Sequence, residues 1–230
     1  MSETSETPFF TVGHSNQSIE AFTELLQQPE VRCTLLVDIR KMPMSRANPQ
    51  FNGEALKASL AACGISYTRI AALGGLRAKV QGVPPAINDY WTNKSFHRYA
   101  DYALTDQFHS GLETLLREGG GRRAAIMCAE VLWWRCHRRL VSDYLIAAGQ
   151  KVFHVLGMGQ VTPAQLTPGA VIMPDQRVQY PQSGQAPVDE AVLGEIVREA
   201  SLLLARKQAP GSCAGNPHAG KEYSRTGEEP

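Results

Sequence analysis

The residues best suited to chemistry follow an apolar run at 124–128. They are Cys128, Glu130, Cys136 and His137, in the spacing Cys-x-Glu-x5-Cys-His. A carboxylate such as Glu130 can accept or donate a proton beside a reacting group. Cys128 would lie between a strand end and a helix N-terminus, with arginines nearby, and such surroundings lower the pKa of a thiol and make it a nucleophile. The pattern predicts acid–base catalysis by Glu130 or thiol chemistry at Cys128.

The same residues allow two further interpretations. Cysteine, histidine and glutamate are all zinc ligands, but this spacing matches none of the common zinc-binding patterns. We therefore predict neither a metal nor another cofactor, and keep zinc at Cys128, Cys136 and His137 as an alternative. In the other interpretation Cys136 and His137 only pack, because they lie one turn before Leu140 and Val141 of a predicted helix.

The segment that leads into this helix is basic. Arg139 lies four residues before Asp143, which is the spacing of an ion pair on a helix surface. Arg138, and with it Arg135, would then be free to bind a phosphate group. The tryptophans at 133–134 either stack on a nucleotide base or pack in the core.

Asp38 and Arg40 end a second apolar run, at 34–39. Because the two residues are two positions apart on an extended chain, their side chains point to the same face. They form either an internal ion pair that closes the strand end, or a carboxylate for proton transfer beside a guanidinium that holds an anion. Ser45, in the turn that follows, would add a contact to the ligand.

Two histidines complete the candidate set of acids and bases. His14 follows Gly13 in a strand-to-helix turn, where Ser15 and the next backbone N–H groups could bind an anion. His154 interrupts a later apolar run, and it is either a partner for Glu130 or a buried core histidine.

A long segment at 74–95 has little periodicity and begins with Gly74 and Gly75. Loops of this length are usually functional, so we predict a lid over the site. The side chains it would contribute are Arg77, Asn88, Tyr90 and Trp91.

The elements that position these residues alternate along the chain. Strands are expected at 9–12, 34–39, 66–70, 124–128 and 151–156, with helical patterns between them. Such alternation predicts an α/β fold, a three-layer sandwich with a mostly parallel sheet, Rossmann-like in type. Right-handed crossovers bring the carboxyl ends of the strands to one edge of the sheet, where ligands bind.

Length and composition limit the other possibilities. The chain has 230 residues, 43% of them hydrophobic, and a net charge of +1, which argues against a histone-like nucleic-acid binder. We predict an α/β domain at 8–178, a linker and C-terminal helix at 179–204, and a disordered tail at 205–230. Five cysteines without a paired framework, and no secretory or membrane-spanning segment, favour a cytoplasmic protein with no membrane partner. The oligomeric state stays open.

Five motifs occur in a fixed order. They are Thr11-Val-Gly-His14-Ser15, Asp38-x-Arg40-x-x-Pro43-x-Ser45, Leu73-Gly74-Gly75, Met127-Cys128-Ala129-Glu130 with Cys136-His137-Arg138, and His154. Over residues 9–173 the chain resembles the domain-of-unknown-function 488 family. The resemblance implies an α/β domain with a polar pocket and no particular reaction. A weaker, topological similarity to rhodanese domains lacks their short Cys-x5-Arg loop.

We predict an enzyme that acts by hydrolysis or group transfer on an anionic substrate, derived from a nucleotide or nucleic acid. The alternatives are a Cys128 thiol enzyme, either rhodanese-like in sulfur transfer or phosphatase-like, and a non-catalytic module that binds a nucleotide or nucleic acid. The expected catalytic residues are Glu130, Cys128, Asp38 and His14. The expected substrate-binding residues are Ser15, Arg40, Ser45, Gly74, Gly75, Cys136, His137, Arg138 and His154.

Overall fold

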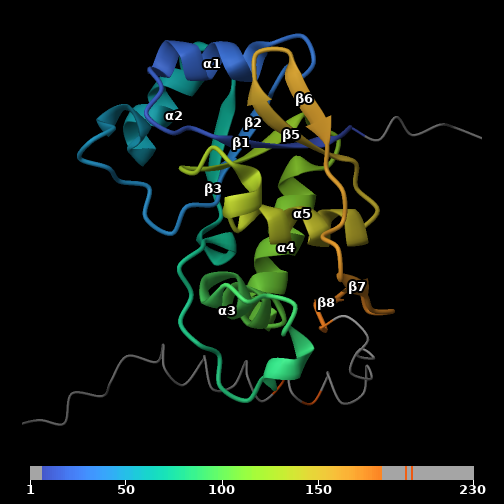
Figure 1. Cartoon of the computed structure of the whole chain (residues 1–230). Coiled ribbons are helices and arrows are strands. Elements are labelled where there is room, and N and C mark those ends of the chain that lie inside the picture. The colour runs from blue at the N-terminus through green and yellow to red at the C-terminus, as the bar shows by residue number, and fades with distance from the viewer. Residues whose placement is uncertain (1–6, 183–194, 196–197, 199–230) are drawn as a thin grey trace, which may run out of the picture.

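A computed structural model describes residues 7–182, 195 and 198 (Figure 1). Apart from 195 and 198, the helix expected within 188–203 and the tail expected at 205–230 lie outside the described residues. In the described part of the chain, every helix is too short or too polar to cross a membrane.

A six-stranded sheet forms the centre of the molecule, in the order β3-β2-β4-β1-β5-β6. Four of its five strand pairs are parallel, and only β6 runs antiparallel, beside β5. The mostly parallel sheet confirms the predicted fold class. The strands are β1 (Phe9–Gly13), β2 (Leu35–Asp38), β3 (Ser66–Arg69), β4 (Ala124–Cys128), β5 (Val152–Gly157) and β6 (Gln160–Pro163).

Helices cover both faces of the sheet, which makes three layers (Figure 1). The side chains of Phe10 and Val12 join one apolar cluster, whereas Phe9 joins the other, because successive residues of a strand point to opposite faces. The first cluster includes apolar residues of α1 (Ile19–Gln27) and α2 (Gly53–Ala62). The second includes those of α3 (Lys94–Ala103), α4 (Asp106–Gly119) and α5 (Arg138–Ala147). Short 3-10 helices lie at Pro49–Phe51, Ala71–Leu73, Pro85–Ile87 and Trp133–Arg135.

The middle of the segment 74–95 differs from the predicted lid. Asn88 and Trp91 are buried, and the amide of Asn88 donates to Asp101 Oδ1 at 2.9 Å. The Trp91 ring stacks on Phe96 of α3. These two side chains anchor the middle of the segment in the core, whereas Gly75, Leu76, Asn93 and Ser95 near its ends line a cavity.

The domain also continues past the boundary expected at 178. Strand β7 (Val171–Ile172) pairs with β8 (Val178–Gln179), and Gln179 is buried where a linker was expected. The hydroxyl of the fully buried Tyr180 donates to Asp143 at 2.9 Å. Asp143 is itself buried, so it does not form the surface ion pair expected with Arg139.

Candidate functional site

The strand order brings the expected site residues to one edge of the sheet. β4 lies between β2 and β1, with Gly13 opposite Cys128 and Asp38 opposite Met127. The residues that follow these three strands therefore meet at their carboxyl ends, as the parallel topology predicts. A cavity of about 440 Å³ opens there. Its walls include Arg40, Lys41, Met42, Gly75, Leu76, Asn93, Ser95, Phe96, Tyr99, Cys128, Ala129, Glu130, Arg135, Cys136 and His137.

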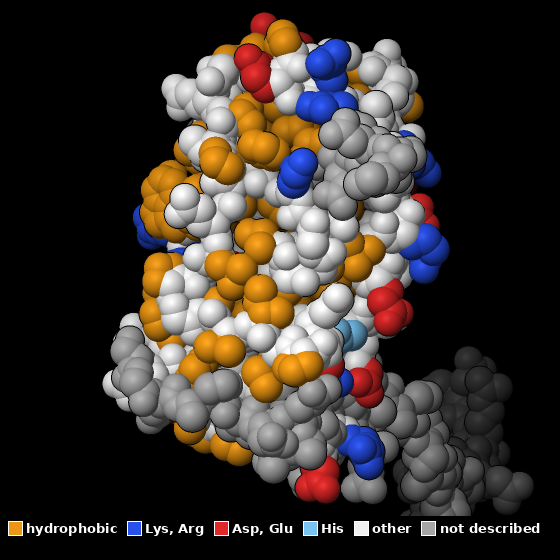
Figure 2. Space-filling model, turned by 90° about the vertical axis from the view of Figure 1, so that its right-hand side faces the viewer, with side chains coloured by type: hydrophobic (Ala, Val, Ile, Leu, Met, Phe, Trp, Pro, Cys, Tyr) orange, Lys and Arg blue, Asp and Glu red, His pale blue; other side chains and the backbone are white. Residues whose placement is uncertain are grey.

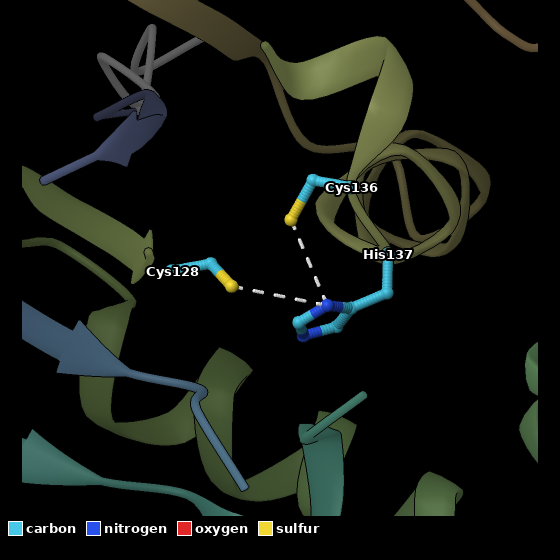
Figure 3. Close-up of side chains that lie close together, drawn as sticks. All are labelled: Cys128, Cys136 and His137. Atoms are coloured by element: carbon cyan, nitrogen blue, oxygen red, sulfur yellow. Dashed lines mark hydrogen bonds between the residues drawn. The ribbon is translucent and has the colours of Figure 1, made fainter. Parts of the chain in front are cut away.

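Two thiols and an imidazole converge on this cavity (Figure 3). Cys128 stands at the end of β4, and Cys136 and His137 immediately precede α5. His137 Nδ1 lies 4.0 Å from the sulfur of Cys128 and 3.6 Å from that of Cys136. His137 Nε2 lies 3.3 Å from the carbonyl oxygen of Ile39, which can only accept a hydrogen bond. The proton therefore sits on Nε2, and the Nδ1 lone pair faces the two sulfurs.

Hydrogen bonds make the two thiols unequal. Cys136 is 4% exposed, and its sulfur accepts a hydrogen bond from Arg138 Nε at 3.4 Å. A hydrogen bond from the Cys128 thiol, with the charge of Arg138 beside it, lowers the pKa of Cys136 well below its usual range. The same hydrogen bond, together with burial, raises the pKa of Cys128.

Close backbone approach explains two glycines at the site. A Cβ on Gly75 would lie 2.8 Å from His137 Nδ1, so only glycine lets the loop pack against the imidazole. A Cβ on Gly74 would lie 3.0 Å from the backbone of Lys41. Gly75 lines the cavity, and both glycines act by fitting the loop to its neighbours.

Asp38 and Arg40 adopt the internal ion-pair arrangement, and Asp38 has no exposed surface. The Asp38 carboxylate accepts hydrogen bonds from the guanidinium and backbone N–H of Arg40 and from the Tyr67 hydroxyl. Arg40 NH2 also donates to the carbonyl of Phe51 at 2.7 Å. A carboxylate saturated in this way does not reach a ligand, which corrects the catalytic role expected for Asp38.

His14 belongs to the same network. Arg40 NH1 lies 3.1 Å from His14 Nε2, and His14 Nδ1 lies 2.7 Å from the carbonyl oxygen of Ser15. Burial lowers the pKa of His14 to about 4, so the ring is neutral at pH 7. Nδ1–H donates to Ser15, and Nε2 accepts from Arg40. With both ring nitrogens occupied, His14 positions Arg40 and is not free to take a proton from a substrate.

Arg138 is fully buried, which corrects the expectation that it is free to bind a phosphate. Its NH2 group donates to the carbonyl oxygens of Glu130 and Val131, so the guanidinium ties the loop after β4 to the start of α5. No sequence signal reveals such a partner, because backbone carbonyls occur at every position.

His154 is also an internal residue. It is buried, with Nδ1 2.8 Å from the hydroxyl of Thr11, and its ring stacks on Trp133 at a centroid distance of 4.1 Å. Burial lowers its pKa to about 4. This arrangement corresponds to the core-histidine alternative.

Glu130 remains in the cavity, where its Oε1 accepts a hydrogen bond from Leu132 N–H at 3.0 Å. Lys41 and the exposed Arg135 line the same cavity. The sequence reasoning missed Lys41, and it missed Tyr99 of the unexpected helix α3. The aromatic residues of α3 were the available signal, since no aliphatic pattern marks that helix.

A second cavity, of about 430 Å³, adjoins the first. It contains Ser15 and Ser45, and it shares Arg40, Met42 and Ala129 with the first cavity. The expected substrate-binding serines therefore lie apart from the thiols, across the shared wall.

Comparison with known proteins gives one match. The family model described as domain of unknown function DUF488 matches residues 18–145, which include both cysteines, Glu130 and the Asp38–Arg40 pair. Neither the curated proteins nor the solved structures contain a match to the chain. Because the matched residues make up more than half of the sequence, the chain belongs to the DUF488 family.

Proposed function

We propose that the protein is an enzyme that acts on a small anionic substrate, by hydrolysis or group transfer, in the 440 Å³ cavity. The observation that supports this proposal is the meeting of Glu130, two thiols, an imidazole and exposed cations in one concave site at the carboxyl ends of the strands. The volume is in the range of sites for small molecules, roughly 300–1,000 Å³.

The charges around the cavity favour an anion. Lys41 and Arg135 are cationic, and Glu130 is the acidic side chain of the described wall. Arg40 contributes little further charge, since Asp38 neutralises it at 2.6 Å. Without the thiols, these side chains have a net charge of +1, and the exposed guanidinium of Arg135 suits a phosphate or carboxylate.

Glu130 is the candidate for proton transfer. Its Oε1 is fixed by Leu132 N–H, which holds the carboxylate at the cavity wall. A fixed carboxylate beside a bound substrate can accept a proton from water or from a substrate hydroxyl. Asp38 and His14, the other expected acid–base residues, are occupied by Arg40.

The test is a substrate panel of nucleoside mono-, di- and triphosphates, nucleosides and short oligonucleotides, with products followed by mass spectrometry. For any substrate turned over, Glu130→Gln should lower kcat about 100-fold or more, because it keeps an acceptor for Leu132 N–H but loses the base. Wild-type rates in Glu130→Gln would refute this role. Failure of every anion to bind or react would refute the substrate class.

A pair of matched variants tests whether the guanidinium of Arg135 binds the anionic substrate. Arg135→Gln should raise KM about tenfold, since a charge-assisted hydrogen bond is lost. Arg117→Gln removes the same charge from an exposed site on α4, where Arg117 pairs with Glu118 at 3.6 Å. This control should leave KM unchanged, and equal effects of both variants would indicate non-specific attraction.

A thiol enzyme is the second candidate function. The sulfur of Cys128 lies in the cavity and 4.0 Å from His137 Nδ1, a nucleophile beside a base. The backbone N–H of Glu130 is directed at the Cys128 sulfur, but the N–H of Leu132 donates to Glu130 Oε1 instead, so it does not join a cradle of N–H groups of the kind that rhodanese-like catalysis needs. Undiminished turnover in Cys128→Ser would exclude the candidate.

The non-catalytic nucleic-acid module receives no support from the face shown in Figure 2. Hydrophobic side chains gather along the middle of that face, whereas Lys and Arg side chains lie mainly towards its margins. A nucleic-acid backbone would instead need a continuous basic surface.

A further inference from the structure

We propose that Cys128, Cys136 and His137 bind a zinc ion whose fourth coordination position faces the 440 Å³ cavity. This site goes beyond the proposed reaction, which is stated without a metal. It also revises the expectation from the sequence, in which zinc was only an alternative for these residues.

The distances between the donor atoms fit one ion. The two sulfurs and a ring nitrogen all lie within 4.8 Å of one another. In a tetrahedral site with Zn–S of about 2.3 Å and Zn–N of about 2.0 Å, sulfur and nitrogen lie about 3.5 Å apart and two sulfurs about 3.8 Å. The observed sulfur–nitrogen distances are 3.6 Å for Cys136 and 4.0 Å for Cys128. The sulfur–nitrogen distances therefore need to shorten by at most about 0.5 Å, and the two sulfurs lie within 4.8 Å of each other.

The surroundings of the donors are those of a metal site. His137 Nε2 donates to the Ile39 carbonyl, which fixes the ring so that its Nδ1 lone pair points between the sulfurs (Figure 3). Metal-bound histidines typically donate their other N–H in this way. Arg138 Nε donates to the Cys136 sulfur, and such N–H···S bonds stabilise a metal-bound thiolate. Gly75 leaves room for the imidazole in this orientation.

Charge and donor type favour zinc over hard cations. Two thiolates neutralise a divalent ion, whereas Mg²⁺ and Ca²⁺ prefer oxygen ligands. The guanidinium of Arg138 donates to the carbonyls of Glu130 and Val131 as well as to the Cys136 sulfur, and these acceptors offset part of its charge. A Cys₂His set therefore suits Zn²⁺, with Co²⁺ as a spectroscopic substitute.

Three protein ligands leave one position open. All three line the cavity, so a water molecule or a substrate oxygen there could complete the tetrahedron. Glu130 lines the same cavity, but it is not part of the donor cluster. The arrangement is that of a zinc site open to a ligand, not that of a closed structural site.

The test measures metal content without any substrate. The full chain is purified under reducing conditions without a metal-affinity tag, stripped with a chelator and reloaded with Zn²⁺. Elemental analysis should give about one equivalent of zinc. Co²⁺ should give a thiolate charge-transfer band and the intense visible bands of a tetrahedral site. Cys128→Ser and Cys136→Ser should each lose the charge-transfer intensity of one sulfur and weaken zinc binding at least tenfold. Cys63→Ser, a partly exposed cysteine after α2, is the matched control and should bind as wild type.

A second measurement uses the unmodified chain, in case a variant does not fold. Zn²⁺ should slow alkylation of Cys128 and Cys136 by a maleimide at least tenfold, as read by peptide mass spectrometry, and should leave Cys63 unprotected. Zinc below about a tenth of an equivalent, or equal alkylation of all three thiols with and without Zn²⁺, would overturn the site. Neither readout depends on substrate turnover, so failure here leaves the anionic-substrate proposal to its own test.

Discussion

The buried His154 should make the free energy of unfolding decrease steeply as the pH is lowered. Its ring lies between Thr11 and Trp133, and burial lowers its pKa from 6.5 to about 4, with a smaller contribution from the charge of Arg138. In the unfolded chain His154 binds a proton near pH 6.5, whereas in the folded chain it binds one only near pH 4. The contribution to stability is therefore present above pH 6.5, and it is lost as the pH falls towards 4.

The size of the effect follows from the two pKa values. A difference of roughly 2.5 pH units at about 1.36 kcal/mol each gives a loss of about 3.4 kcal/mol below pH 4. At pH 5 the linkage relation gives about 2 kcal/mol of this loss, and at pH 7.5 it gives almost none. The variant His154→Phe keeps a ring to stack on Trp133 but removes the titrating group.

The assay is urea unfolding at pH 7.5 and pH 5.0. The loss of unfolding free energy between these values should be about 2 kcal/mol smaller in His154→Phe than in wild type. Thr11→Val is the control, because it removes the hydrogen bond and keeps the imidazole, so its loss should match wild type. Other groups titrate in the same range, including His14, but they are common to all three proteins. An equal loss in His154→Phe and wild type would refute the linkage.

Three further substitutions test the framework by thermal and urea unfolding. Gly13→Ala should destabilise by roughly 3 kcal/mol or more, because its Cβ would lie 2.1 Å from the carbonyl oxygen of Glu130; a near-native melting temperature would contradict this. Arg138→Met should cost roughly 3–5 kcal/mol, since it removes a fully buried side chain and leaves the carbonyls of the half-buried Glu130 and Val131 without their donor; a loss below 1 kcal/mol would show that water replaces the guanidinium. Burial raises the pKa of Asp143 to about 6, so the protonated form favours folding and this contribution falls by up to about 3 kcal/mol as the pH rises from 4 to 7; Asp143→Asn should remove that fall, and an unchanged pH dependence would contradict it.

Strands that are buried on both faces could be predicted from the sequence, because each is a continuous apolar run between turn residues. β2 and β4 are such strands. The edge strand β6 was missed because its residues are exposed or half-buried, so it carries no apolar signal. Helix α3 was missed because its core side is made by Tyr99, Tyr102 and alanines, which form a weak aliphatic pattern.

The location of the site followed from topology, but the roles of its residues did not. A parallel sheet brings its strand ends together, and that rule placed Cys128, Glu130, Asp38 and His14 at one edge. The rule does not predict which polar side chains form hydrogen bonds or ion pairs within the protein. Asp38 meets Arg40 two residues away, and this pairing was one of two stated alternatives.

Two buried arginines at this edge are held mainly by acceptors within the protein. Arg40 joins the end of β2 to His14 and to the carbonyl of Phe51, and Arg138 joins the loop after β4 to α5. Arg40 is held by acceptors on three segments, and Arg138 is held by two carbonyls of one loop and by the sulfur of Cys136. Each arginine therefore fixes part of the cavity wall. A buried guanidinium without these acceptors would strongly destabilise the folded state. The segments that carry the acceptors must therefore stay close to the two arginines, which fixes the position of the cavity wall. The two thiols and His137 are consequently brought within 4.8 Å of one another by the protein itself, and a cation entering the cavity would meet donors that are already oriented.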